Sequence, residues 1–163
     1  MEKRVLFLGI GNPILRDDAI GFIILNKLKE RIHSELFEFK TEAIGGWHIL
    51  DIIKGYETVI IIDSIYNNKV DEKIGSVSKL DLEDFAAFVR PASPHDLNII
   101  TAIELGKKMG QQMPSRFIIF AINISPQYFF GDEISEELKG KTENIVNAIL
   151  NDEDIQELIK VPI

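Results

Sequence analysis

The segment VLFLGIGNPILRDDAIG, residues 5–21, decides the fold of this chain. It begins as a short apolar strand, passes through a glycine turn, and ends in two adjacent aspartates, Asp17 and Asp18, directly before a helix. In an open α/β sheet such a segment carries polar groups to the carboxyl edge of the strands, where ligands bind. We therefore expect the rest of the chain to supply partners for these aspartates at the same edge.

Composition limits the classes of function. The chain has 163 residues, enough for one domain with a sizeable core, and its net charge of −8 argues against nucleic acid or anionic membranes as partners. The absence of cysteine excludes disulfides, thiolate metal sites and cysteine nucleophiles, and agrees with a reducing cytoplasm. No stretch resembles a signal peptide or a spanning helix, so we expect a soluble cytoplasmic protein without membrane insertion.

Apolar periodicity predicts alternating strands and helices in a single domain over residues 1–163. Strands are expected at residues 4–8, 36–40, 58–62, 75–80 and 116–122, and helices at residues 20–32, 47–54, 82–89, about 93–109 and 135–150. Gly140 weakens the continuity of the last helix. This alternation predicts a three-layer α/β/α sandwich with a mostly parallel, twisted sheet of about five strands.

Three candidate ligands follow strand ends or begin a helix: Asp18 after the first strand, Asp63 at the end of the third, and His95 in the first turn of a helix opened by SPHD. If the strands are parallel, all three meet at one edge of the sheet. Two carboxylates and an imidazole suit a divalent transition metal with open coordination positions. The positive end of a helix dipole also favours the neutral imidazole that a metal needs.

Each candidate also has a structural interpretation. Asp17 is expected to be the N-cap of the first helix, which leaves Asp18 for chemistry. Asp63 could accept a hydrogen bond from a loop amide, and His95 could be an ordinary residue at a helix start. His33 and His48 are not expected to be ligands.

Other common motifs are weak or absent. Gly9-Ile10-Gly11-Asn12 lacks the third glycine of a dinucleotide turn, and the acids that follow would repel a pyrophosphate, so nucleotide binding is disfavoured. GxSxG, a P-loop lysine and HExxH do not occur, so serine hydrolase, phosphoryl-transfer and zincin chemistry have no support.

In these motifs the chain resembles the hydrogenase maturation endopeptidases, which trim the C-terminal extension of nickel-iron hydrogenase large subunits. The matching motifs are GIGN with DDAIG (residues 9–12 and 17–21), VIIID (residues 59–63) and SPHDL (residues 93–97). The resemblance implies an α/β/α fold, a large-subunit precursor as partner, and a site where Asp18, Asp63 and His95 meet the nickel already inserted in the substrate. Nickel is thus expected mainly from the substrate, with another divalent metal able to occupy the site.

The chain departs from the family pattern in two places. The family commonly has glutamate at the position of Asp18. Aspartate is a conservative replacement, and its carboxylate has a shorter reach. At residues 41–46 the family has Asp-Gly-Gly followed by threonine and glycine; here Gly46 matches the last glycine and Glu42 is the nearest acid. Two alternatives therefore remain: a hydrolase of another peptide or amide with a permanently bound metal, and a non-catalytic assembly chaperone for metal-loaded precursor. Oligomeric state is left open.

Overall fold

The computed structural model describes residues 4–43, 46–66, 73–88, 99–127 and 129–160. Its strands are β1 (Val5–Gly11), β2 (Phe37–Ala43), β3 (Thr58–Ile65), β4 (Val77–Leu80) and β5 (Arg116–Asn123). Its helices are the 3-10 turn η1 (Arg16–Ala19), α1 (Ile20–Arg31), α2 (Gly46–Ile53), α3 (Leu82–Phe88), α4 (Ile99–Lys108), α5 (Glu136–Lys139), α6 (Thr142–Leu150) and α7 (Glu153–Lys160).

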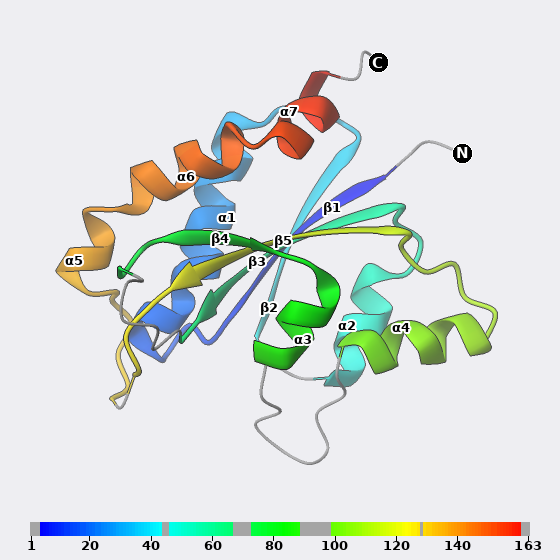
Figure 1. Cartoon of the computed structure of the whole chain (residues 1–163), viewed down its shortest axis with the longest axis horizontal. Helices are drawn as coiled ribbons and strands as arrows, with labels where there is room; N and C mark the ends of the chain where they lie inside the picture. The colour runs from blue at the N-terminus through cyan, green and yellow to red at the C-terminus, as the bar shows by residue number, and fades with distance from the viewer. Residues whose placement is uncertain (1–3, 44–45, 67–72, 89–98, 128, 161–163) are drawn as a thin grey trace.

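The five strands form one sheet in the order β2-β1-β3-β5-β4. Four strands run parallel, and β4 is antiparallel to β5 at one edge. Helices α1, α5, α6 and α7 cover one face of the sheet, and α2, α3 and α4 cover the other (Figure 1). The predicted three-layer sandwich with a mostly parallel sheet is confirmed.

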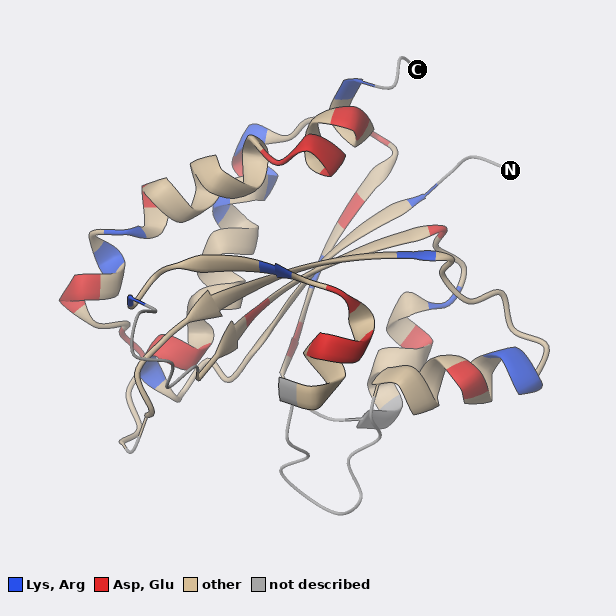
Figure 2. Cartoon of the chain, viewed as in Figure 1, with Lys and Arg blue, Asp and Glu red and all other residues tan. Residues whose placement is uncertain are grey.

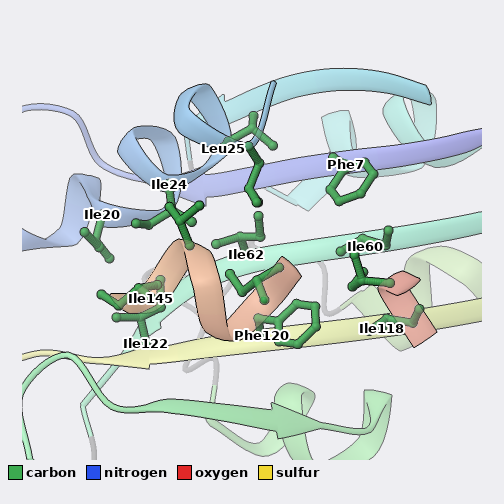
Figure 3. Close-up of a cluster of buried hydrophobic side chains, with 14 of the residues drawn as sticks. Phe7, Ile20, Ile24, Leu25, Ile60, Ile62, Ile118, Phe120, Ile122 and Ile145 are labelled. Carbon is green, nitrogen blue, oxygen red and sulfur yellow. The ribbon is translucent and has the colours of Figure 1, made fainter. Parts of the chain in front are cut away.

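Two hydrophobic clusters lie on opposite faces of the sheet because successive strand residues point in opposite directions. On the α1 and α6 side, strand residues such as Phe7, Ile62 and Phe120 pack against Ile24 and Ile145 (Figure 3). The alternate strand residues pack toward α2 and α4; they include Leu6, Leu8, Val59, Ile61 and Ile119. Strands covered on both faces need continuous apolar sequence, and the central strands have such sequence.

The two central strands separate at the carboxyl edge. β1 pairs with β3 only as far as Gly9 opposite Ile62, whereas β1 continues beside β2 to Gly11 and β3 continues beside β5 to Ile65. The chain leaves β1 toward one edge of the sheet and leaves β3 toward the other. This is the topological switch point at which open α/β sheets bind ligands.

Two glycines allow helix α1 and the turn before it to lie directly over this separation. A Cβ on Gly21 would lie 2.3 Å from the carbonyl oxygen of Ile10 and 2.6 Å from that of Ile62. A Cβ on Gly11 would lie 2.3 Å from the carbonyl oxygen of Asp18. No side chain fits at either position without moving backbone, so these glycines determine where Asp18 sits.

We expect Gly21→Ala to destabilise the protein by about 3 kcal/mol, the upper part of the range for overpacking, because backbone rather than a side chain must move. Gly140→Ala is the matched control, since the nearest atoms to its Cβ are 3.6 Å away and its φ of −64° suits alanine. That control is expected to be neutral or stabilising. Urea unfolding of both variants checks this, and equal unfolding midpoints would refute the close-approach argument.

The structure differs locally from the sequence prediction: β2 and β3 run past their predicted ends to Ala43 and Ile65, so Asp63 lies inside its strand. β1 extends past Leu8 to Gly11, because β2 continues to pair with both glycines. The last predicted helix divides into α5 and α6 at Gly140, and α7 was not predicted.

None of the described helices is both long enough and apolar enough to cross a membrane.

Candidate active site

Asp18 lies in η1, immediately beyond the carboxyl end of β1, and is 7% exposed. The backbone N–H of Asn12 donates a hydrogen bond of 3.2 Å to its Oδ2. The Ser64 hydroxyl donates to its Oδ1. The carboxylate is therefore held between the turn after β1 and the end of β3, across the switch point.

Asp63 lies inside β3, two residues before the strand ends, and is 8% exposed. Burial raises the pKa of this carboxyl from 3.8 to about 8; the N–H of Ser64, which donates to Oδ1 at 2.7 Å, opposes the rise, and the charge of Asp18 adds to it. Two aspartates predicted from separate motifs thus interact at the same edge of the sheet. In the absence of a cation, Asp63 holds a proton at neutral pH.

Ser64 connects these two carboxylates and was missed in the sequence interpretation. Its backbone N–H binds Asp63 and its hydroxyl binds Asp18. The available signal was a hydroxyl directly after an aspartate at the end of an apolar strand. Only the position of Asp18 over β3 gives that hydroxyl a partner, so sequence spacing alone could not assign it.

The donor set fits a divalent cation. Two neighbouring buried carboxylates cannot both be ionised cheaply, and a cation between them would favour the ionised forms. Within the described part of the chain, no group of three or more His, Cys, Asp or Glu residues is close enough to hold a metal. His95, the expected third ligand, lies outside the described residues, so its role stays a prediction.

Asp17 is not the N-cap of the first helix, which corrects the sequence expectation. Helix α1 begins after Ala19 with no side-chain cap, and Asp17, only 3% exposed, turns toward Gln127 and Ser135. Its carboxylate accepts hydrogen bonds from the backbone N–H and the hydroxyl of Ser135. Asp17 therefore joins the turn after β1 to the start of α5.

The remaining candidates lie outside the acidic pair. Glu42 is in β2 opposite Ile10, so β1 separates it from Asp63. His33 and His48 are exposed, the latter on α2. Tyr66, which directly follows β3, has its pKa raised by burial and then by the charge of Asp18.

Asp18 is a predicted metal ligand, so we expect Ser64→Ala to weaken binding of Ni²⁺ about tenfold. The variant removes the hydroxyl that orients Asp18, and outer hydrogen-bond partners of ligands typically contribute 10- to 100-fold. Ser76→Ala is the matched control, since the buried hydroxyl of Ser76 has no hydrogen-bond partner in the described structure. Isothermal titration of each variant with Ni²⁺ measures the effect. Equal affinities for the two variants would exclude an orienting role for Ser64.

Comparison with known proteins finds similarity to hydrogenase maturation proteases, both in a family model and in a single relative. A family model described as "HycI: Hydrogenase maturation protease" matches residues 24–152. Over 110 residues the chain is 31% identical to the hydrogenase 2 maturation protease of Escherichia coli (strain K12), a match covering 66% of this chain and 66% of that protein.

Two solved structures share the fold over almost the whole chain. The hydrogenase maturating endopeptidase HybD from E. coli superimposes with a TM-score of 0.75 at 24% identity, covering 95% of this chain and 93% of that chain. The [NiFe] hydrogenase maturation protease HycI from Thermococcus kodakarensis KOD1 gives a TM-score of 0.64 at 21% identity, covering 94% and 93%.

Proposed function

Because this chain belongs to the hydrogenase maturation protease family, we propose that it is an endopeptidase that removes the C-terminal extension of a nickel-iron hydrogenase large-subunit precursor. The resemblance inferred from the sequence motifs is confirmed at the level of the family, and the family's name is that of a peptidase. In this proposal cleavage follows nickel insertion, and the nickel held by the substrate is the recognition signal.

The observation that carries the proposal is the acidic pair at the switch point. Asp18 and Asp63 are both buried, and Ser64 hydrogen bonds to each of them. A cation that arrives with the substrate stabilises the ionised forms of a buried carboxylate pair most strongly, since it removes the repulsion between the two charges. His95 is proposed as the third ligand to that cation.

The residues of this chain then have separate roles. Asp18 is held in its orientation by Asn12 and Ser64. Asp63 holds a proton at neutral pH because burial raises its pKa to about 8. Contact with the substrate's nickel favours the ionised carboxylate, so the proton of Asp63 is released when the precursor is correctly loaded.

Incubation of the purified protein with the large-subunit precursor of the same organism, nickel-loaded and nickel-free, tests the proposal by mass spectrometry. C-terminal shortening only of the nickel-loaded precursor is the expected result. Binding of the loaded precursor without shortening would favour the assembly chaperone. Cleavage of other peptides by protein that purifies with stoichiometric metal would favour the metal-dependent hydrolase.

A further inference from the structure

Exposed apolar side chains occur in two segments that meet at the turn before Asp18. Among the described residues, Ile14, Phe129 and Phe130 have exposed fractions of 58%, 75% and 79%. They lie in the turn after β1 and in the segment between β5 and α5, both beyond the carboxyl ends of the central strands. Neighbouring apolar side chains left in water commonly mark an interaction site.

The backbone joins the two segments that carry these side chains. The N–H of Gly131 donates to the carbonyl of Ile14 at 2.9 Å, and the N–H of Arg16 donates to the carbonyl of Gly131 at 3.0 Å. The bonds from Ser135 to Asp17 hold the same two segments together one turn further along. The surface is therefore organised before anything binds, which reduces the entropy lost on association.

This surface is continuous with the candidate site. Ile14 lies four residues before Asp18 in the same turn, and Asp17 donates its N–H to the side chain of Gln127, two residues before Phe129. The phenol oxygen of Tyr66, a residue that is 45% exposed, accepts a hydrogen bond from the backbone N–H of Gln127 and interacts with the charge of Asp18. A polypeptide lying across the acidic pair would extend over these side chains.

Charge indicates the chemistry of the occupant. Residues 124–131 contain no charged side chain, and the described part of this segment is tan in Figure 2, the colour of uncharged residues. Acids outnumber bases beside it: the buried Asp17 and Asp18 and the exposed Asp132, Glu133, Glu136 and Glu137 face the bases Arg16, Lys139 and Lys141. The two lysines pair with Glu133, Glu136 and Glu137, which leaves a net negative charge around the segment. An apolar segment with basic residues beside it would complement this pattern and the net charge of −8.

We propose that Ile14, Phe129 and Phe130 form a docking surface for an apolar segment, flanked by basic residues, of the precursor polypeptide on which the enzyme acts. The proposal rests on the proposed function for the identity of the partner. Its physical basis is independent of the cleavage chemistry: a preorganised apolar surface directly beside the acidic pair.

The test compares a Phe129→Ser, Phe130→Ser double variant with a Met109→Ser control. Met109 is 61% exposed and lies between α4 and β5, at the opposite, amino end of the parallel strands. All three substituted residues are on the surface, so both variants should fold. For nickel-loaded precursor, we expect the double variant to raise the Kd and the KM about tenfold or more with little change in kcat, and the control to match wild type.

Binding and cleavage are measured separately, so that failure of the docking surface and failure of the proposed function can be told apart. If wild type cleaves the precursor and the double variant binds it equally well, the docking surface is refuted and the function stands. If wild type binds without cleaving, the endopeptidase proposal fails, while a tenfold weaker Kd in the double variant still supports the surface. If wild type neither binds nor cleaves, both proposals fail.

Sedimentation of the free protein tests whether a second copy of this chain occupies the surface instead. A dimer that the double variant converts to a monomer, with precursor binding unchanged, would assign the surface to a second copy of this chain and overturn the proposal. A wild-type protein that is monomeric, or whose self-association is unaffected by the double variant, agrees with it.

Discussion

At pH 8 the Asp63→Asn variant is expected to unfold at a higher temperature than the wild-type protein and to lose precursor processing. Burial raises the pKa of Asp63 from 3.8 to about 8, so between these values the folded chain holds a proton that the unfolded chain has released. The free energy of unfolding therefore falls with rising pH, by up to about 1.4 kcal/mol per pH unit from this group. Asparagine has no proton to release, which removes this slope.

Thermal and urea unfolding of both proteins from pH 4 to pH 9 measures the effect. The stabilisation that comes from the raised pKa of Asp63 is fully present below about pH 4 and is lost as the pH rises through about 8. The free energies of unfolding of wild type and Asp63→Asn should therefore converge at the acid end and separate toward about pH 8. Asp132→Asn, a change at an exposed carboxylate, is the control and should follow wild type. Parallel profiles for wild type and Asp63→Asn would contradict the buried, protonated state.

Loss of processing in Asp63→Asn has a separate cause. The amide keeps the oxygen that accepts from the Ser64 N–H, so local geometry is retained, but it cannot supply the negative ligand that the proposed function assigns to the substrate's nickel. A variant that gains stability while losing activity is expected of a residue retained for chemistry rather than for the fold. A variant that is more stable and still cleaves would remove Asp63 from the proposed site.

The second large effect is expected for His95→Ala, which should reduce cleavage of nickel-loaded precursor by more than about a hundredfold. Even outer hydrogen-bond partners of metal ligands typically contribute 10- to 100-fold, and a ligand itself contributes more. From its predicted place in the first turn of a helix, His95 adds little to the core, so the free energy of unfolding should change little. Mass spectrometry of the precursor and a thermal melt of the variant give the two readouts.

His48→Ala is the control for that experiment, because His48 is exposed on α2 and is not expected to be a ligand. It should process precursor at the wild-type rate. Retained processing by His95→Ala would count strongly against the three-ligand site. Loss of both activity and folded structure would assign His95 to the fold instead, and His95→Gln, which keeps size and hydrogen bonding, then separates the two roles.

The sequence by itself determined the layer architecture and the edge on which the site lies. Continuous apolar strands alternating with amphipathic helices require a sheet covered on both faces, since neither element can bury its apolar residues alone. Parallel strands then place the residues that follow them at one edge, which is why Asp18 and Asp63 could be assigned to one site from separate motifs. Family membership followed from the same motifs and is confirmed by the comparison with known proteins.

Only the tertiary structure decided which groups surround those aspartates. Asp17 and Asp18 are adjacent in sequence, yet one binds Ser135 and the other Ser64. The turn that carries them begins at Arg16, which has a φ of 48° and donates its N–H to the carbonyl of Gly131. The pKa of Asp63 depends on burial and on the charge of Asp18, and Gly21 allows the segment of Asp18 to approach the carbonyl of Ile62, on a strand distant in sequence. These properties arise from contacts between distant segments, so no local pattern of residues could have specified them.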